Sequence, residues 1–256
     1  MRISRPTKRV VAPVCAILGI LAVWQGACSA GLVPNFMLPS PVQVVAALVG
    51  DLPLLCQHLL WTLAEAALGL AIGVAVGFAF AVLMDHFETF YLAFDPLLTV
   101  SQTVPTVAIA PLFVLWFGYG LLPKVLLVVI TTFFPVTVAL ANGFRSVDQD
   151  QIDLMRTMRA TEWQIFRYAK LPAAMDQFFS GLRISATYAI VGAVISEWLG
   201  GFWGLGVYMT RVRKSFSYDR MFAVIIIISA LSLALMRGVD VLERLCMPWK
   251  RAERND

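Results

Sequence analysis

The stretch "LLWTLAEAALGLAIGVAVGFAFAVLM" (residues 59–84) is apolar along nearly its whole length and contains no proline. About 20 such residues in a helix cross the hydrocarbon core of a bilayer, so the stretch predicts a membrane-spanning helix. Gly69, Gly73 and Gly77 recur every four residues, and Ala81 continues the row. Small residues at this spacing let a second helix approach closely in lipid. We expect the three glycines to form a helix-packing face, with chance spacing in a glycine-rich span as the alternative.

The composition of the whole chain agrees with a membrane protein. Hydrophobic residues make up 59% of the 256 residues, charged residues only 14%, and the mean hydropathy is +0.78. Soluble domains have about 45–50% apolar and about 25% charged residues. The predicted fold class is therefore an all-α membrane protein. The net charge of +4 is spread over several loops and gives no reason to expect nucleic acid as a partner.

Five further stretches predict spans, for a total of six transmembrane helices. They lie at about 10–32, 97–117, 124–142, 178–199 and from residue 221 onward. Proline interrupts the span at 97–117 (Pro105, Pro111) and the span at 124–142 (Pro135), which predicts kinks or breaks in these helices. Residues 33–58 carry four prolines and predict a loop with a short helix after "PSP", and residues 84–96 predict a short polar turn.

The N-terminal span has an alternative interpretation. A basic start, an apolar run and "ACSA" resemble a cleaved secretory signal. The apolar run from Val10 to Trp24 is long for a signal, and Gln25 does not suit a lipoprotein cleavage site before Cys28. We therefore expect an uncleaved first helix.

The distribution of lysine and arginine along the chain predicts how the chain is oriented in the membrane. Most of them lie near the N-terminus, in residues 143–183 and in the C-terminal tail, and fewer lie in the alternate loops. Positive charge favours the cytoplasmic side. We expect both termini and residues 143–177 on the cytoplasmic side of the membrane.

One segment of the chain is charged, "QIDLMRTMRATEWQIFRYAKLPAAM" (residues 151–175). Its apolar residues fall on helical faces, Ile152, Met155 and Met158 in the first half and Trp163 and Phe166 in the second. Such a helix either lies on lipid headgroups or docks into a groove of a cytosolic partner. The residues alone leave both alternatives open.

The sequence lacks the motifs that nucleotide binding, metal binding and intramembrane catalysis require. No lysine follows a glycine, so the chain has no P-loop for ATP. The four cysteines and two histidines have no metal-ligand spacing, and the spans hold no catalytic Ser/His or paired-Asp arrangement. An intramembrane enzyme is therefore not expected. A secondary transporter remains the alternative of another class, although neither inverted repeats nor midplane charges are evident.

The charged segment resembles the "EAA" loop of membrane subunits of binding-protein-dependent ATP-binding-cassette (ABC) importers. Leu171-Pro172 matches the end of that motif, Asp153-Leu154-Met155 takes the place of Glu-Ala-Ala, and Arg159 stands where the family has glycine. The family glycine lies in a turn between two short helices, where positive φ favours it. The resemblance implies that this segment docks to an ATPase subunit through Asp153, Met155, Met158, Arg159, Ala160, Leu171 and Pro172.

The resemblance extends over about residues 59–249. It rests on "LPSP" (38–41), "QTVPTVAIAPLFVLWFGYG" (102–120), "RSVD" (145–148), "WQIFRYAKLPAA" (163–174) and "GLRISATYAIVGAVISEWLG" (181–200), and is closest to permeases for sulfonates, taurine, nitrate and thiamine's pyrimidine precursors. It implies the type I permease fold with a cytoplasmic coupling helix in residues 143–177, and a place in the cytoplasmic (inner) membrane of a bacterial cell. Residues 1–58 then form a first helix with a periplasmic linker, residues 59–249 the transmembrane domain, and residues 250–256 a tail.

The resemblance also implies partners. These are a second copy of the chain, two ATPase subunits that bind ATP and Mg²⁺, a periplasmic or lipid-anchored substrate-binding protein, and membrane lipid. The chain itself needs no cofactor under this interpretation and acts as a transport subunit, not as an enzyme.

Polar and aromatic groups at membrane depth are candidates for a translocation path. Gln102, Thr103, Trp116 and Glu197 satisfy this description. Glu197 lies near the outer end of its span, where exposure to water or pairing with Arg211 are alternatives. Few basic residues lie in the spans, and "QTVPTVAIAPLFVLWFGYGLLPK" (102–124) and "ATYAIVGAVISEWLG" (186–200) resemble permeases for thiamine's aminopyrimidine precursors more than sulfonate permeases. This resemblance implies a hydroxymethylpyrimidine-type thiamine precursor as the expected substrate, with sulfonates, taurine or nitrate second and riboflavin-like compounds third.

Overall fold

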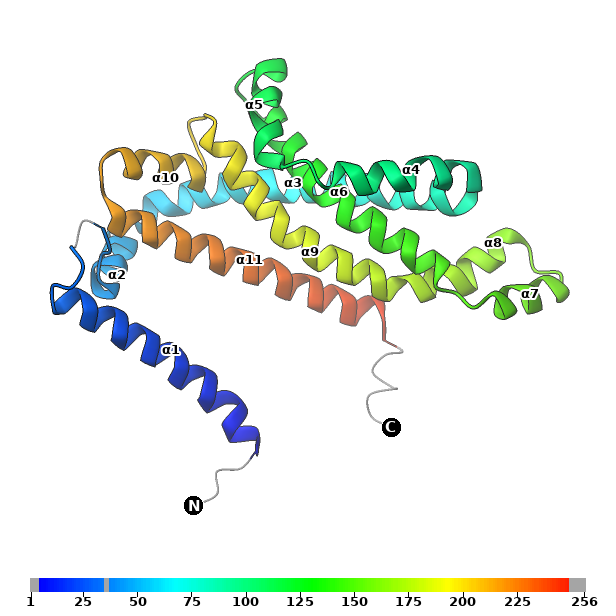
Figure 1. Cartoon of the computed structure of the whole chain (residues 1–256), viewed down its shortest axis with the longest axis horizontal. Coiled ribbons are helices and arrows are strands. Elements are labelled where there is room, and N and C mark those ends of the chain that lie inside the picture. Colours follow the sequence, from blue (N-terminus) through cyan, green and yellow to red (C-terminus); the bar gives the residue numbers. More distant parts are fainter. Residues whose placement is uncertain (1–4, 35–36, 249–256) are drawn as a thin grey trace.

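The computed structural model describes residues 5–34 and 37–248, and every regular element within these residues is a helix. Figure 1 shows an elongated bundle with most long helices running along one axis. The elements are α1 (Arg5–Ser29), α2 (Pro41–Gly50), α3 (Leu52–His86), α4 (Glu88–Ser101), α5 (Thr106–Phe117), α6 (Leu121–Arg145), α7 (Gln149–Thr157), α8 (Glu162–Ile165), a π-helix (Phe166–Lys170), α9 (Leu171–Trp198), α10 (Leu205–Lys214) and α11 (Tyr218–Cys246).

The bundle is built on α3, α6 and α9. Gly69, Gly73 and Gly77 all lie buried on the face of α3 that packs against α6. A Cβ atom on Gly73 would lie 2.0 Å from Thr132 Oγ1, and one on Gly69 would lie 2.4 Å from Val128 Cβ. Only glycine therefore permits this separation of the two helices, and close packing replaces the hydrophobic effect in lipid.

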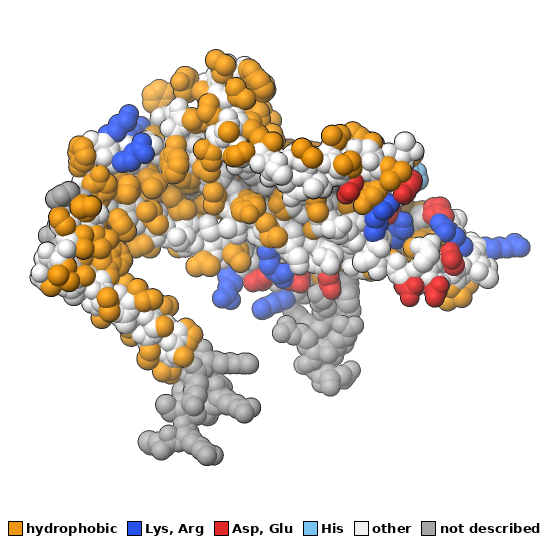
Figure 2. Space-filling model, viewed as in Figure 1, with side chains coloured by type: hydrophobic (Ala, Val, Ile, Leu, Met, Phe, Trp, Pro, Cys, Tyr) orange, Lys and Arg blue, Asp and Glu red, His pale blue; other side chains and the backbone are white. Residues whose placement is uncertain are grey.

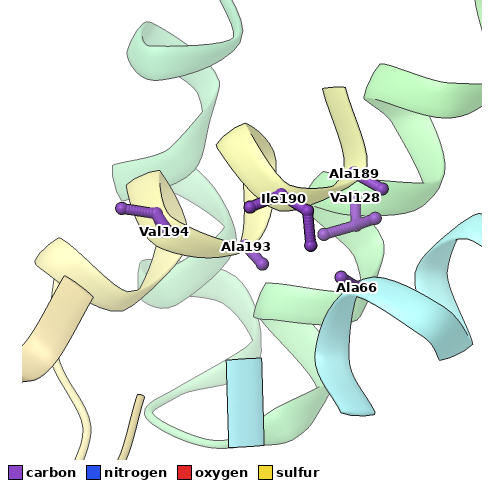
Figure 3. Packing of buried hydrophobic residues seen from close by; sticks show 6 residues of the cluster. All are labelled: Ala66, Val128, Ala189, Ile190, Ala193 and Val194. Atoms are coloured by element: carbon purple, nitrogen blue, oxygen red, sulfur yellow. The ribbon is translucent and has the colours of Figure 1, made fainter. Parts of the chain in front are cut away.

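The centre of the three-helix contact is filled by small and branched side chains. Figure 3 shows α3, α6 and α9 meeting around Ala66, Val128, Ile190 and Ala193, which lie about the space between the helices. All of them are at most 6% exposed, as expected for a tightly packed core. The cluster consists of Ala66, Val128, Ala189, Ile190, Ala193 and Val194.

The prediction of an all-helical membrane protein is confirmed. Five helical segments within the described residues are long and apolar enough to cross a bilayer, and a bent pair, α4 with α5, makes a sixth if it counts as one span. Side chains of both signs of charge gather over α7 and α8 and near the C-terminal end of α11, and Lys and Arg alone gather over α10 (Figure 2). Hydrophobic side chains cover much of the rest of this face.

The third predicted span differs from the structure. We expected one kinked helix at 97–117 after a polar turn at 84–96, but α4 already begins at Glu88 and meets α5 at an angle of 99°. Val104 precedes Pro105, and a residue before proline disfavours helical backbone. Thr103 bonds the Val100 carbonyl instead, which closes the end of α4.

Three further boundaries differ from the expected ones. The predicted break at Pro135 is wrong, because α6 continues through it and packs tightly on α9, where Gly181 lies against the Pro135 carbonyl. The fifth span is longer than 178–199, since its helix begins at Leu171. The polar loop expected before Arg220 contains α10.

The first helix is set apart from the bundle. Figure 1 shows α1 diverging from α11. Only 6% of the apolar stretch of α1 is buried within the structure. It is joined to the rest near its C-terminal end, where Trp24 Nε1 donates to the Pro39 carbonyl at 3.1 Å and the Trp24 ring lies 5.8 Å from that of Phe222.

Candidate functional site

The charged segment forms two short helices joined by a tight turn. Asp148 caps α7 by accepting a hydrogen bond from Asp150 N at 3.0 Å. Thr161 and Gln164 form a capping box at the start of α8, with each side chain bonded to the other residue's backbone. These caps satisfy backbone groups that a short exposed helix otherwise leaves to water. The segment is therefore an ordered helix–turn–helix.

The turn between the two helices depends on Arg159. This residue has φ +59, one of two non-glycine residues with positive φ in the described chain. Its N–H donates to Arg156 O at 2.9 Å, and Ala160 N–H donates to Met155 O at 3.0 Å. This is the Schellman pattern that ends helices, and glycine is the usual residue at its left-handed position. Arg159 thus adopts the backbone conformation that the family motif leads us to expect of glycine.

The outer face of the segment is partly apolar. Met158 is 75% exposed and Trp163 is 69% exposed, whereas Met155 is half-buried and Ile152 is buried. The ridge expected from Ile152, Met155 and Met158 is therefore divided between the core and the surface. Asp153 is exposed beside it and lies 3.6 Å from Arg156.

An ion pair fastens this segment to a membrane-spanning helix. Lys170 Nζ lies 2.7 Å from Asp85 Oδ1 at the end of α3, with both side chains largely buried. Just before the segment, Arg145 at the end of α6 pairs with Glu88 at the start of α4 at 3.0 Å and covers the ring of Tyr91. Leu171 and Pro172 are half-buried where the π-helix passes into α9. A movement of the segment would therefore reach α3 and α9 directly.

A cavity of about 450 Å³ lies between the α4–α5 bend, α6 and α9. Of the four predicted path residues, Gln102 lines it, and Thr103, Trp116 and Glu197 do not. Thr103 and Trp116 are exposed elsewhere on the bend and on α5. The lining has no charged side chain and consists of Ser101, Gln102, Val104, Thr106, Ile109, Ile130, Thr131, Phe134, Pro135, Tyr188, Val191, Gly192 and Ile195.

Glu197 takes part in a buried polar network at the end of the bundle that carries α10. It is 0% exposed, accepts a hydrogen bond from Thr62 Oγ1 at 2.7 Å, and accepts another from Gly206 N at 2.6 Å. His58 Nδ1 accepts from Gly204 N at 3.0 Å. Because Glu197 is fully buried, its carboxylate does not face water outside the membrane. The Arg211 guanidinium donates to the Phe202 carbonyl and does not pair with Glu197. Glu197 therefore anchors the start of α10 to α3.

A buried ion pair beside this network escaped the sequence analysis. Lys124 Nζ lies 2.7 Å from Glu65 Oε1, and the two side chains are 9% and 2% exposed. Glu65 is an acidic residue within the predicted span 59–84, and an ionisable group in a span is a functional signal in its own right. Lys124, in contrast, stands at the first residue of the predicted span 124–142, where a lysine side chain can reach water.

The geometry of the charged segment and the bundle agrees with the comparison with known proteins. Residues 69–246 match the family described as "Binding-protein-dependent transport system inner membrane component". The chain belongs to this family. It is a permease subunit of an ABC importer, and membership implies ATPase and substrate-binding partners. The expected type I permease fold and family resemblance are thereby confirmed, and the secondary-transporter alternative is replaced.

Several similar proteins match nearly the whole chain. A "Probable ABC transporter permease protein" of Haemophilus influenzae is 37% identical over 91% of this chain and 95% of its own length. The "Formylaminopyrimidine transport permease protein ThiX" of Halalkalibacterium halodurans is also 37% identical, over 94% and 96%. Other relatives are named as permeases for riboflavin, aliphatic sulfonates, taurine and nitrate.

A solved structure supports the fold. A chain titled "Crystal structure of an amino acid ABC transporter with histidines" superposes with a TM-score of 0.60 at 24% identity. The match covers 77% of this chain and 94% of the other.

Proposed function

We propose that the chain works as one of two identical permease subunits that import a hydroxymethylpyrimidine-type compound, and that residues 143–177 couple this transport to an ATPase subunit. Both termini and the charged segment then lie in the cytoplasm of a bacterial cell, and α10 faces the periplasm. The positive charge of the segment supports this orientation.

The turn at Arg159 carries the coupling part of the proposal. A left-handed residue at the position of the family glycine supports the alignment of the whole segment with the docking motif. The exposed Met158 and Asp153 then face the ATPase subunit, and the Lys170–Asp85 pair transmits its movement to α3. Rigid elements joined in this way move together, which a flexible loop would not do.

The uncharged cavity carries the substrate part of the proposal. Its lining offers Gln102, Thr131 and Tyr188 as polar groups among apolar side chains. A neutral heteroaromatic ring suits such a surface, because aromatic rings pack on apolar walls and bond through a few polar atoms. A sulfonate or nitrate ion would enter it without a positive partner, at a high desolvation cost.

The experiment that tests this proposal measures uptake and binding with the complete transporter. The chain is expressed with its ATPase subunit and substrate-binding protein, and the binding protein is titrated by calorimetry with 4-amino-5-hydroxymethyl-2-methylpyrimidine, taurine, an alkanesulfonate, nitrate and riboflavin. Binding and ATP-dependent uptake of the pyrimidine are expected. Tight binding of any of the other compounds, with none of the pyrimidine, would overturn the substrate assignment and leave the permease role in place.

A further inference from the structure

The polar side chains around the large cavity beside the α4–α5 bend are partly engaged in hydrogen bonds within the chain. Ser101 Oγ and Gln102 Nε2 both donate to the Leu98 carbonyl, at 2.8 Å and 3.3 Å. Thr131 Oγ1 donates to the Val128 carbonyl at 2.8 Å. Both hydroxyls and one amide N–H are therefore in use, while the oxygen atoms of these three lining side chains remain able to accept.

The orientation of the Gln102 amide follows from the end of α4. Leu98 lies in the last turn of this helix, where side chains commonly bond the final carbonyls. A main-chain carbonyl only accepts hydrogen bonds, so the amide must turn its NH2 group toward it. Gln102 is exposed and lines the cavity, and its Oε1 makes no hydrogen bond among the described residues. A molecule in the cavity therefore meets a free and accessible acceptor at Gln102.

A second acceptor comes from the backbone of α6. Pro135 lies inside this helix and lines the cavity. Proline has no N–H, so the carbonyl of Thr131, four residues earlier, lacks the donor that an α-helix normally supplies. Within a span such a carbonyl is tolerated beside neighbours or a cavity that can satisfy it. Thr131 itself lines the cavity, so the lining includes a main-chain carbonyl without a helical donor.

The donors that are free to meet a ligand lie mainly on Thr106 and Tyr188. The hydroxyls of both, and the backbone N–H of Thr106 at the start of α5, make no hydrogen bond among the described residues. The lining contains no lysine, arginine or histidine. The bend thus offers an acceptor at Gln102 and donors four residues later. An oxyanion brings acceptors alone and leaves Gln102 Oε1 without a partner.

We propose that Gln102 selects the substrate of this cavity. Its Oε1 accepts an N–H from the amino group of a planar heterocycle, and Thr106 donates to the neighbouring ring nitrogen. The amino group has two N–H bonds, and the Thr131 carbonyl accepts the second. Apolar side chains of the wall, including Phe134 and Ile195, pack against the ring. This inference rests on the proposed function for the pyrimidine class, and it adds a selecting residue of the permease to the selection by the binding protein.

The experiment measures binding to the full-length permease in lipid nanodiscs by saturation-transfer-difference NMR, which detects weak ligands. The two probes are 4-amino-5-hydroxymethyl-2-methylpyrimidine and 5-hydroxymethyl-2,4-dimethylpyrimidine, in which a methyl group of similar size replaces the amino group. Saturable binding is expected for the amino compound, with affinity at least about tenfold weaker for the dimethyl compound, because Gln102 Oε1 then loses its partner.

Two variants of Gln102 separate selection from a structural role. Gln102→Leu keeps the size of the side chain and removes the acceptor, so affinity for the amino compound should fall at least about tenfold while that for the dimethyl compound stays unchanged. Gln102→Glu keeps acceptor oxygens and should keep the preference. A merely structural role would weaken both compounds alike. The matched control is Gln57→Leu, the same exchange at an exposed glutamine of α3 outside the cavity, and it should change neither affinity.

Pro135→Ala tests the Thr131 carbonyl. Alanine supplies the missing N–H, which occupies this carbonyl and adds a hydrogen bond to α6. Affinity for the amino compound should fall about fivefold without a loss of thermal stability, and that for the dimethyl compound should stay unchanged. Unchanged affinity for the amino compound would overturn the role of the Thr131 carbonyl.

Three results would overturn the role of Gln102: no saturable binding by the wild-type permease, equal affinity for the two compounds, or a preserved preference in Gln102→Leu. The comparison of the two compounds needs only the wild-type protein, so it holds even if a variant fails to fold. ATP-dependent uptake of the amino compound by the complete transporter, together with any of these results, would remove the role of Gln102 and leave the proposed function standing.

Discussion

Lys170 Nζ lies 2.7 Å from Asp85 Oδ1, and this contact joins the charged segment to the far end of a helix 85 residues earlier in the chain. Both side chains are shielded, at 20% and 11% exposure. The contact therefore ties a surface segment to a core helix of the bundle.

Removing one member of the Lys170–Asp85 pair should uncouple movements of the charged segment from movements of α3. Asp85→Asn is expected to lower the stability by about 1.5–3 kcal/mol, the range for a hydrogen bond to a charged group. ATP hydrolysis should continue while uptake falls, because the segment still docks but no longer moves α3. Thermal unfolding and the ratio of uptake to hydrolysis measure the two effects. The exchange Asp85→Lys with Lys170→Asp should restore part of the coupling, and no restoration with full folding would argue against a role for the ion pair.

The left-handed turn at Arg159 makes a prediction about stability. Arg159→Gly should raise stability by up to about 1 kcal/mol or leave it unchanged, since glycine adopts positive φ without strain. Arg159→Val should destabilise the segment and reduce uptake, because a β-branched residue is strongly disfavoured at positive φ. Thermal unfolding in nanodiscs compares the two variants. Equal stability of the glycine and valine variants would contradict the turn.

The docking face makes a prediction about the ATPase subunit. Met155→Glu with Met158→Glu should abolish copurification of the ATPase and uptake, because charge replaces the exposed Met158 and the half-buried Met155 beside it. Membrane insertion should be unaffected. Phe216→Glu is the control, since Phe216 is equally exposed, at 75%, and follows α10 at the other end. Normal copurification and transport in the double variant would remove the docking role of this face.

We expect the contact between α3 and α6 to depend on the buried glycines of α3. Gly73→Ala places a methyl group 2.0 Å from Thr132 Oγ1 and 3.0 Å from the Val129 carbonyl, so α3 and α6 must separate. Overpacking of this kind costs about 1–3 kcal/mol. Gly19→Ala in α1 meets no atom within 4 Å and should be neutral or slightly stabilising. Similar unfolding temperatures for the two variants would show that the α3–α6 contact tolerates a methyl group.

The sequence predicted the apolar helices better than the way in which they bend. Length and hydropathy suffice for a span, and the spacing of Gly69, Gly73 and Gly77 predicted a packing face. The distinction between Pro105, which ends a helix, and Pro135, which α6 accommodates, depends on neighbouring helices that no local pattern records.

The charged segment could be predicted because its motif is continuous in the sequence. The buried Glu65–Lys124 pair could not, because its two residues lie far apart in the chain. The turn at Arg159 followed from the spacing to Leu171-Pro172. The Glu65–Lys124 pair joins residues 59 positions apart, and Lys124 alone is indistinguishable from a loop lysine. Glu197 was predicted as a path residue, but it bonds Thr62 of α3 and Gly206 of α10 and does not line the uncharged cavity.

The most direct test of the account is uptake by proteoliposomes that contain the permease and its ATPase subunit, with the binding protein and labelled 4-amino-5-hydroxymethyl-2-methylpyrimidine on one side. We expect uptake only when ATP and Mg²⁺ are on the side of the charged segment, opposite the binding protein, with no effect of dissipating ion gradients. Uptake that proceeds without ATP and follows an ion gradient would contradict the account.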